Sequence, residues 1–361
     1  MTKQLIIAAI SARAYAKAAN AFGYKVITLD AFADADTKGV AEQYLQVRMT
    51  DDGVDEADFK QKFEQINVEE GYQLIYGSLF DANPALLAWV ADRVEVIGNL
   101  PQTLQISRSF DFFVLLDNLG IRHPEVRLDL PNDAKSWLVK RLNSSGGAHV
   151  RPTELGIKGD YFQRKIDGEP VSLLFLADGK TARTVGFNQQ LLASTADMPY
   201  RFAGALSGAV LPMTVQQEFV DAAQRLTAAL GLRGLNSLDA VLDGDSLWIL
   251  ELNPRLSATF QLYPKLLQAH LQASAGELVD LIENKTARAE FVLYADEQLN
   301  IPADFSWPDW AADIPFTDVD SVAIDRDEPV CTVLAEGENA VAAHQLLLER
   351  VKKLKGKLFH D

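Results

Sequence analysis

Three chemically active side chains follow an apolar segment at alternate positions: the carboxylate of Glu251, the carboxamide of Asn253 and the guanidinium of Arg255. Residues two apart on a strand share one face, so the three groups point the same way. Asp239 precedes them, and a turn at Gly244 would fold its strand back against this one as a hairpin. Two acids and an amide oxygen would then converge. Oxygen ligands of this kind suit Mg²⁺ or Mn²⁺ bound together with substrate phosphates.

Arg255 would lie beside these ions, where its fork can hold phosphate oxygens. Taken singly, the same residues also fit a surface ladder of charges between strands, and Asn-Pro commonly opens a turn. The apolar residues 248–250 (Trp-Ile-Leu) indicate a buried strand, however. Charges that enter a buried sheet need partners, so the combination favours a metal site over a surface ladder.

A second candidate site follows the strand expected over residues 137–141, where Lys140 interrupts an apolar segment. The next residues form a small, flexible loop: Ser144, Ser145, Gly146 and Gly147. Glycines let successive backbone N–H groups turn toward one anion, and a lysine adds a point charge on phosphates. The lysine precedes the glycines, so this is no Walker loop, and Ser-Ser-Gly-Gly alone is more typical of a mobile hairpin turn. His149 beside the loop could touch phosphate, although a solvated loop histidine is favoured.

A third segment, residues 161–172, predicts a strand, a turn and a second strand. Its first strand carries Gln163, Arg164, Lys165 and Ile166. An extended strand of this sort can offer backbone groups and a glutamine side chain to an adenine edge. From this segment alone, an edge strand with solvated Arg and Lys is the better interpretation.

Composition limits the partners. Acids outnumber bases 50 to 34, a formal net charge of -16, which disfavours nucleic acid and anionic membranes because a phosphate backbone is bound by neutralising it. No segment approaches the length needed to span a bilayer, and the first apolar run is too short for a signal peptide, so a cytoplasmic location is expected. The single cysteine, Cys331, excludes an intramolecular disulfide, fits a reducing compartment and lies in a segment that predicts a buried strand.

The first hundred residues alternate short apolar strands with amphipathic helices, which predicts a parallel sheet with helices on both sides. No G-x-G-x-x-G follows the first strand, so a dinucleotide site is not expected, and Asp30 is interpreted as a strand-end cap. One linking helix is expected over residues 101–119. Strands with tight turns follow, then a long helix over residues 215–230 that ends at Gly231, so this portion is α+β.

Taken in order, the lysine, the Ser/Gly loop and the acid pair followed by Asn-Pro-Arg at residues 253–255 resemble the ATP-grasp superfamily, the fold of biotin carboxylase, D-alanine-D-alanine ligase and glycinamide ribonucleotide synthetase. The resemblance covers most of the chain. It implies an α/β and α+β fold, with a Rossmann-like pre-ATP-grasp domain in residues 1–100 followed by a two-lobed ATP-grasp domain. The linker helix and first lobe would occupy residues 101–180, the second lobe with the metal site 181–290, and a C-terminal extension packed on the grasp domain 291–361.

The resemblance also implies a role for each candidate residue near the phosphates. Asp239, Glu251 and Asn253 would hold two Mg²⁺ or Mn²⁺ ions. Arg255 would steady the γ-phosphate or an acyl-phosphate, and Lys140 would contact the α- and β-phosphates. Asp239 stands where a glutamate is commoner in the family, which should be tolerated because aspartate also ligates Mg²⁺.

By the same resemblance, the loop of residues 144–147 would close over the triphosphate, and residues 163–166 would meet the adenine. Gln163 stands where an acid often accepts from the adenine amino group, and its carbonyl oxygen can do the same. The family's linker helix usually carries a second phosphate-binding lysine near Ser109, and this chain has none there. Arg108 is the candidate substitute.

The function that the resemblance implies is an ATP- and Mg²⁺-dependent ligase that joins a small-molecule carboxylate to an amine through an acyl-phosphate. Two alternatives stay open: a carboxylase-type subunit that forms carboxyphosphate from bicarbonate, and a nucleotide-binding regulatory protein without turnover. A homodimer is also possible, although the strand over residues 330–334 and the last helix fit a core as well.

Three further segments resemble uncharacterised ATP-grasp proteins of one-carbon metabolism: residues 10–15 (Ile-Ser-Ala-Arg-Ala-Tyr), the acids of residues 30–36 and residues 200–202 (Tyr-Arg-Phe). Tyramine-glutamate ligase of methanofuran synthesis is a more distant relative in this group. The resemblance therefore points to a cofactor pathway of the methanofuran or methanopterin type. Arg201 would hold a substrate carboxylate, or it is a surface arginine.

Overall fold

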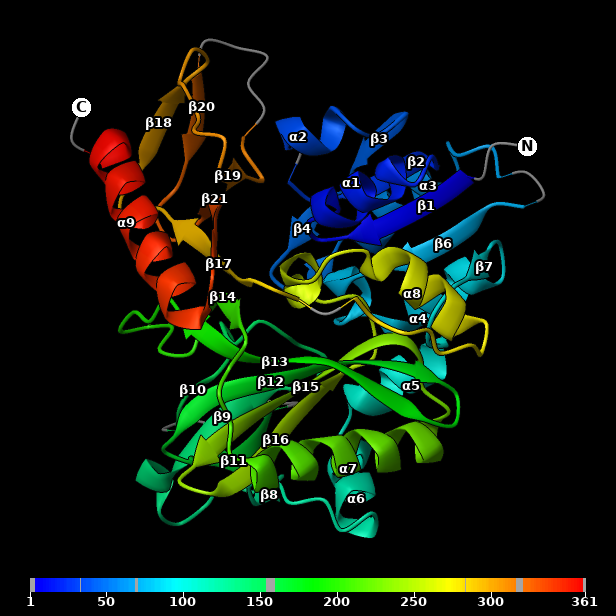
Figure 1. The fold of residues 1–361 in the computed structure, drawn as a ribbon, viewed down its shortest axis with the longest axis vertical. Coiled ribbons are helices and arrows are strands. Elements are labelled where there is room, and N and C mark those ends of the chain that lie inside the picture. The colour runs from blue at the N-terminus through cyan, green and yellow to red at the C-terminus, as the bar shows by residue number, and fades with distance from the viewer. Residues whose placement is uncertain are drawn as a thin grey trace.

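The computed structural model describes residues 4–32, 34–68, 71–153, 160–282, 284–315 and 321–359. The N-terminal unit contains the elements β1 (Gln4–Ala9), α1 (Arg13–Ala21), β2 (Lys25–Asp30), α2 (Ala35–Lys38), β3 (Gln43–Gln46), β4 (Met49–Thr50), β5 (Gly53–Val54), α3 (Glu56–Phe63), β6 (Gln73–Tyr76), η1 (Ser78–Phe80), α4 (Pro84–Ala91) and β7 (Glu95–Val96). Its five-stranded sheet has the order β3-β2-β1-β6-β7, and every pairing is parallel (Figure 1). The predicted parallel sheet is confirmed.

Asp30 ends β2 as a cap. Its Oδ2 accepts a hydrogen bond from the backbone N–H of Ala12 at 2.5 Å, and its Oδ1 accepts one from Phe32 at 2.8 Å. The carboxylate therefore serves the backbone around the sheet edge, as the sequence predicted.

The predicted single linking helix is wrong, because the segment folds as two helices, α5 (Pro101–Ser107) and α6 (Asp111–Asn118). The hydroxyl of Ser107 donates to the carbonyl of Leu104, and that of Ser109 to the carbonyl of Ile106. Such local bonds compete with continued helix. Arg108 lies at the break, and its side chain turns into the protein interior.

A four-stranded antiparallel sheet comes next along the chain. Its segment contains β8 (Val126–Arg127), η2 (Ala134–Ser136), β9 (Trp137–Arg141), β10 (Arg151–Pro152) and β11 (Asp160–Arg164). The strand order is β10-β9-β11-β8. Trp137, Val139 and Phe162 form a small buried cluster under it, which explains why Lys140 follows apolar residues.

The largest sheet has eight strands and extends to the C-terminus. Its segment contains β12 (Glu169–Asp178), β13 (Ala182–Leu192), β14 (Phe202–Ser207), α7 (Met213–Leu230), β15 (Arg233–Asp243), β16 (Ser246–Asn253), η3 (Ala258–Leu262), α8 (Leu266–Ser274), β17 (Ala287–Tyr294), β18 (Leu299–Pro302), β19 (Ala311–Ala312), β20 (Ser321–Ile324), β21 (Pro329–Gly337) and α9 (Ala340–Phe359). The strand order is β16-β15-β12-β13-β14-β17-β21-β19, while β18 and β20 pair separately. Helix α7 ends at Gly231 with φ +64°, as predicted.

Strand β12 pairs with β13 and β15, so it belongs to the large sheet although the expected boundary at residue 180 put it in the first lobe. The predicted hairpin around Gly244 is confirmed, with Asp239 opposite Glu251. A register shift follows Asp239, and such irregularities redirect side chains at a site.

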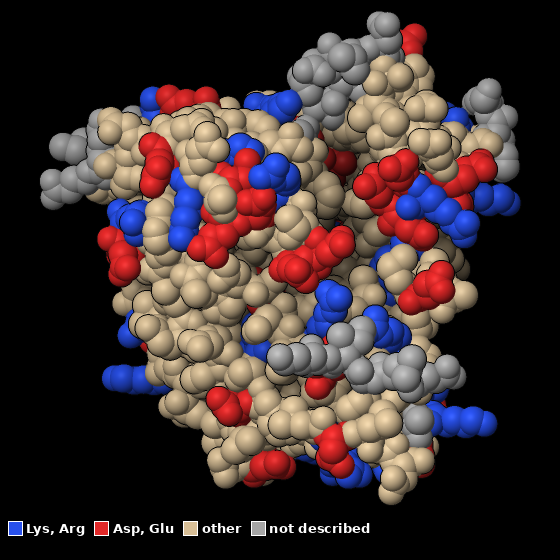
Figure 2. Space-filling model, turned by 180° about the vertical axis from the view of Figure 1, so that it is seen from behind, with Lys and Arg blue, Asp and Glu red and all other residues tan. Residues whose placement is uncertain are grey.

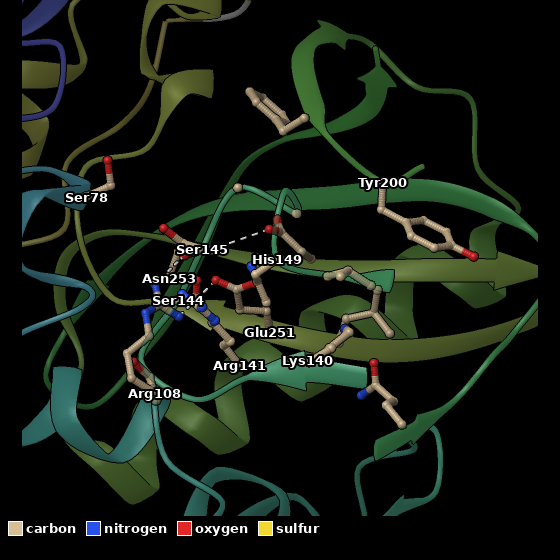
Figure 3. A pocket seen from close by; sticks show the side chains of 18 of the residues that line it. Ser78, Arg108, Lys140, Arg141, Ser144, Ser145, His149, Tyr200, Glu251 and Asn253 are labelled. Atoms are coloured by element: carbon tan, nitrogen blue, oxygen red, sulfur yellow. Dashed lines mark hydrogen bonds and ion pairs between the residues drawn. The ribbon is translucent and has the colours of Figure 1, made fainter. Parts of the chain in front are cut away.

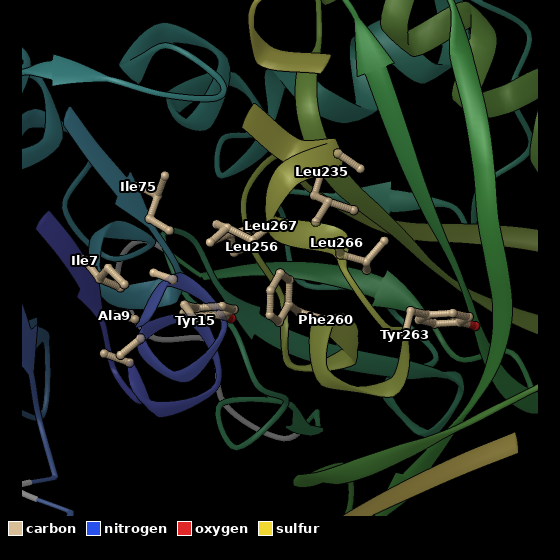
Figure 4. Close-up of a cluster of buried hydrophobic side chains, with 14 of the residues drawn as sticks. Ile7, Ala9, Tyr15, Ile75, Leu235, Leu256, Phe260, Tyr263, Leu266 and Leu267 are labelled. Carbon is tan, nitrogen blue, oxygen red and sulfur yellow. The ribbon is translucent and has the colours of Figure 1, made fainter. Parts of the chain in front are cut away.

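A buried apolar cluster joins the N-terminal unit to the large sheet (Figure 4). Tyr15 of α1 meets Phe260 of η3 edge to face, with ring centroids 5.0 Å apart. Ile7 of β1 belongs to the same cluster, as do Leu266 and Leu267 of α8. Burial of this apolar surface fixes the two units against each other. Among the helices in the described residues, none is long and apolar enough to cross a membrane.

Candidate active site

A cavity of about 400 Å³ lies between the four-stranded and the eight-stranded sheets. Strands β9 and β11 supply one wall, while β13, β15 and β16 supply the other. The predicted site residues in its lining are Arg108, Lys140, Ser144, Ser145, Gly146, Gly147, Gln163, Arg164, Ile166, Asp239, Glu251, Asn253 and Arg255. The tertiary structure therefore brings together segments that are more than a hundred residues apart.

The hairpin acids lie on one side of this cavity. Asp239 and Glu251 are paired across β15 and β16, and Asn253 Nδ2 donates to Asp239 Oδ2 at 3.0 Å. Burial and the charge of Glu251 raise the pKa of Asp239 to about 7, although Arg255 and a hydrogen bond from Gln190 act in the opposite direction. A cation between the two carboxylates would relieve this repulsion.

The donor set fits Mg²⁺, which binds through one or two carboxylates and takes further oxygens from phosphates and water. In the described part of the chain, no group of three or more His, Cys, Asp or Glu side chains is placed to hold a metal ion by itself. Asp239 and Glu251 would therefore hold the ion only together with a phosphate-bearing ligand.

Two buried arginines converge on one aspartate beside these acids. Arg255 donates to Asp81 through Nη2 at 2.6 Å and through Nε at 3.0 Å, and Arg108 donates to Asp81 at 3.0 Å. Arg108 also pairs with Glu251 at 2.9 Å, and both arginines donate to Asn253 Oδ1. Burial alone would raise the pKa of Asp81, but the two guanidinium groups hold it below its usual value.

Arg108 was expected to replace a phosphate-binding lysine, yet its side chain is 2% exposed and its terminal nitrogens bond protein oxygens. It lines the cavity while committed to Glu251 and Asp81, so contact with phosphate requires these pairs to rearrange. Sequence reasoning missed Asp81 altogether. A signal existed, because Asp81 follows the buried strand β6 at the carboxyl edge of the parallel sheet, where ligand-binding residues gather.

The basic side of the cavity comes from β9 and the loop after it (Figure 3). Burial lowers the pKa of Lys140 to about 8, while Glu251 and Asp239 act to raise it. Gly147 has φ +75°, and a Cβ there would stand 2.0 Å from the carbonyl oxygen of Tyr200. In Figure 3 Arg108, Ser145 and Asn253 group at one end of the view and Tyr200 lies at the other.

The loop is held over the cavity and does not hang free as a mobile hairpin turn would. The backbone N–H of Phe202 donates to the carbonyl of Gly146 at 3.0 Å. This bond and the close approach of Gly147 to Tyr200 dock the loop on the start of β14. The loop therefore closes one side of the cavity.

The residues of the third predicted segment contribute unequally to the lining of the cavity. Gln163 is 1% exposed, and its Nε2 has no hydrogen-bond partner among the described residues, so a donor aimed at a buried site is left unused. Ile166 lines the cavity with it. Arg164 lies over the ring of Trp137, 4.9 Å from its centroid. Lys165 is exposed and pairs with Asp167 at 2.6 Å, so its side chain turns to solvent.

Two other expectations change. His149 was expected to be a solvated loop histidine, but it is half-buried in the cavity wall, and burial lowers its pKa to about 4.

Arg201 is buried instead of lying at the surface. It pairs with Asp327 at 3.0 Å, and its guanidinium lies 4.0 Å from the ring centroid of Tyr294. Arg201 therefore secures the C-terminal strands, and its guanidinium is already paired.

Residues 110–259 match the family model described as ATP-grasp domain. This part of the chain is therefore similar to an ATP-grasp domain. Its similarity to the uncharacterised protein MJ0776 of Methanocaldococcus jannaschii is 25% identity, over 67% of this chain and 64% of that protein. The match thus spans less than two thirds of that relative's length.

Solved structures support the fold over nearly the whole chain. N5-carboxyaminoimidazole ribonucleotide synthetase from Thermotoga maritima has a TM-score of 0.69 at 13% identity and covers 97% of this chain and 98% of its own. The biotin carboxylase domain dimer of 2-oxoglutarate carboxylase from Hydrogenobacter thermophilus, solved with MgADP, ADP and bicarbonate, has a TM-score of 0.74 at 11% identity and covers 98% and 90%. The predicted ATP-grasp resemblance and mixed α/β fold are confirmed.

Proposed function

We propose that this protein is an ATP- and Mg²⁺-dependent ligase that joins a small-molecule carboxylate to an amine through an acyl-phosphate. The observation that carries the proposal is the cavity between the two sheets, where Lys140 and the Ser/Gly loop face the paired acids Asp239 and Glu251. One wall thus offers cations and N–H donors to phosphates, and the other offers carboxylates to the accompanying metal. The similar domain from Hydrogenobacter thermophilus binds MgADP, which supports the same ligand here.

The residues have separate tasks in this proposal. Lys140 contacts the α- and β-phosphates, the loop of residues 144–147 covers the triphosphate, and Gln163 meets the adenine edge. Asp239 and Glu251 hold Mg²⁺, with Asn253 completing the set once its oxygen leaves the two arginines. Bound Mg²⁺ would neutralise charge on the phosphates and orient them for transfer.

The reaction needs no nucleophile from the protein. A substrate carboxylate oxygen forms a bond to the γ-phosphorus while the bond to the β–γ bridging oxygen breaks, and ADP leaves. The amine nitrogen then bonds to the acyl carbon, phosphate leaves with the electron pair, and the amine proton passes to solvent. Arg255 beside the cavity stabilises the charge of the acyl-phosphate, so positioning and charge neutralisation supply the rate.

Release of ADP and phosphate tests the proposal, with ATP, Mg²⁺ and a panel of carboxylates and amines. We expect turnover that needs one acid and one amine and that is lost in Glu251→Gln and Asp239→Asn. The matched control is Asp245→Asn, an exposed acid in the turn of the same hairpin. Turnover with bicarbonate alone would support carboxyphosphate formation instead. Binding of ATP without any turnover would support a regulatory protein. If the wild-type protein does not bind ATP at all, the proposed function is wrong.

A finer proposal places the reaction in a cofactor pathway of the methanofuran or methanopterin type. It is supported by the resemblance of residues 10–15 to proteins of one-carbon metabolism. Tyramine with glutamate therefore belongs in the substrate panel. Absence of turnover with this pair and with other intermediates of such pathways would count against the finer proposal and leave the ligase chemistry standing. A homodimer stays a prediction, which size-exclusion chromatography with light scattering would test.

A further inference from the structure

The terminal N–H groups of Arg108 are matched by protein oxygens, and two of these oxygens belong to proposed metal ligands. Nη1 donates to Glu251 Oε1 at 2.9 Å and to the carbonyl of Leu252 at 3.1 Å. Nη2 donates to Asn253 Oδ1 at 2.6 Å and to Asp81 Oδ2 at 3.0 Å. A guanidinium has four terminal N–H groups, so these four acceptors use all of them. Arg108 therefore occupies the amide oxygen of Asn253 and one carboxylate oxygen of Glu251.

Arg108 and a metal ion would compete for these oxygens. The amide oxygen of Asn253 also accepts from Arg255 at 2.9 Å, so both of its lone pairs are in use. A divalent cation at Asp239 and Glu251 would lie close to the charge of Arg108, and the two cations would repel each other. The ion can therefore take its full set of ligands only when the guanidinium of Arg108 moves away.

The backbone of Arg108 is fixed, while its side chain lines the cavity. Its carbonyl oxygen accepts from the backbone N–H of Asn143 at 3.2 Å, directly before the Ser/Gly loop. Its Nε has no hydrogen-bond partner among the described residues, although the side chain is 2% exposed, so one buried donor is left for a ligand. Figure 3 shows Arg108 grouped with Asn253 and with Ser145 of that loop. Rotation of the side chain within the cavity would carry the guanidinium from the acids to phosphates covered by the loop.

The surface of the protein attracts cations. The formal net charge is -16, and Figure 2 shows a hollow between the N-terminal unit at upper left and the C-terminal strands at upper right, with acidic side chains on both rims and basic ones below. Such a charge distribution raises the local concentration of free divalent cations. A guanidinium already bound to Glu251 and Asn253 opposes the entry of metal ions that arrive without nucleotide.

We propose that Arg108 is the internal counter-ion of the metal ligands and releases Glu251 and Asn253 only when Mg²⁺ enters with ATP, an inference that rests on the proposed function. The phosphates of ATP offer new acceptors to the freed guanidinium and further ligands to the ion. Asp81 keeps a charge partner in Arg255 throughout. Without nucleotide, the displaced guanidinium would be a buried cation with too few acceptors, which is costly. The protein therefore takes up metal and nucleotide together.

Binding of Mn²⁺ to the free protein, followed by the electron paramagnetic resonance signal of unbound Mn²⁺, tests this without turnover. We expect Arg108→Met to bind Mn²⁺ without nucleotide roughly tenfold more tightly than wild type, because the competing charge is gone. Arg108→Lys should give a smaller gain, since one ammonium nitrogen cannot cover both Glu251 and Asn253. The matched control is Arg122→Met, an exposed arginine that pairs with Glu218 at 3.9 Å, and it should bind Mn²⁺ like wild type.

The same titrations with a non-hydrolysable ATP analogue measure how strongly nucleotide and metal reinforce each other. The analogue should raise the Mn²⁺ affinity of wild type by a larger factor than that of Arg108→Met, because only wild type has a cation to displace. Glu251→Gln measures the Mn²⁺ that binds elsewhere on the acidic surface. Melting temperatures show whether each variant is folded, and Arg108→Lys decides the question if Arg108→Met is not.

A Mn²⁺ affinity that is unchanged or lower in the folded Arg108 variants would overturn the inference and leave Arg108 as a fixed support of the acids. An equal effect of the analogue on wild type and Arg108→Met would overturn it as well. Wild type that binds the analogue with Mn²⁺, beside variants that show no gain, loses only this role of Arg108. Wild type that does not bind the analogue loses the proposed function, and the inference falls with it.

Discussion

Asp81 is the residue whose loss should most clearly expose how the N-terminal unit supports the active site. Its carboxylate is 2% exposed and accepts from both Arg108 and Arg255. Asp81→Asn keeps the shape of the side chain but removes the charge that compensates two buried guanidinium groups. Removing one partner of a buried ion pair costs about 3–5 kcal/mol because the other charge is left without compensation.

The size of the expected change in melting temperature follows from chain length. Unfolding entropy of about 2.1 cal/mol/K per residue gives roughly 0.8 kcal/mol/K for 361 residues. A loss of about 3–5 kcal/mol therefore lowers the melting temperature by about 4–6 °C. Scanning calorimetry of Asp81→Asn beside wild type measures it directly. ATP turnover should fall as well, because Arg255 loses the partner that orients it.

A matched variant separates this effect from the general cost of removing an acid. Asp296 pairs with Lys355 at 2.7 Å at the surface, with the two side chains 66% and 38% exposed. Exposed pairs contribute about 0–1 kcal/mol, so Asp296→Asn should lower the melting temperature by roughly 1 °C or less. If Asp81→Asn melts within 1 °C of Asp296→Asn, the reasoning about the buried arginines is wrong.

Three further predictions concern the loop, the buried carboxylate of Glu290 and the cavity lysine. Gly147→Ala should weaken ATP binding more than Gly146→Ala in calorimetric titrations. Both positions have positive φ, but only a Cβ at Gly147 would clash with the carbonyl of Tyr200. Equal losses of affinity in the two variants would contradict the docked loop. Glu290→Gln should be the more stable protein above pH 8. The folded-state pKa of Glu290, about 8, exceeds its ordinary 4.5. The free energy of unfolding of the wild type therefore falls by roughly a few kcal/mol as the pH rises between these two values, and the variant avoids this loss. Parallel pH profiles of the two proteins in denaturant unfolding would refute the prediction. ATP affinity should fall between pH 7 and 9, because Lys140, with a pKa of about 8, loses its proton in this range. Lys140→Met should bind ATP more weakly, and its affinity should depend less on pH. An unchanged pH dependence in this variant would exclude Lys140 as the cause.

The sequence by itself determined the local geometry of the metal side. Alternation along β16 and the turn at Gly244 suffice to bring Asp239 opposite Glu251, because strand period and hairpin closure are short-range properties. The parallel N-terminal sheet and helix α7 followed from hydrophobic periodicity for the same reason.

Only the tertiary structure decided which charges from distant segments face one another. Asp81 meets Arg255 from 174 positions away, and Arg13 meets Asp313 from 300. No local pattern encodes such pairs, since they depend on how whole units pack. At Arg108 the two levels combine, because the hydroxyls of Ser107 and Ser109 favour the local break, while distant acids hold the guanidinium that turns inward there. Burial then shifts the pKa of each charged group, and burial is a property of the assembled fold.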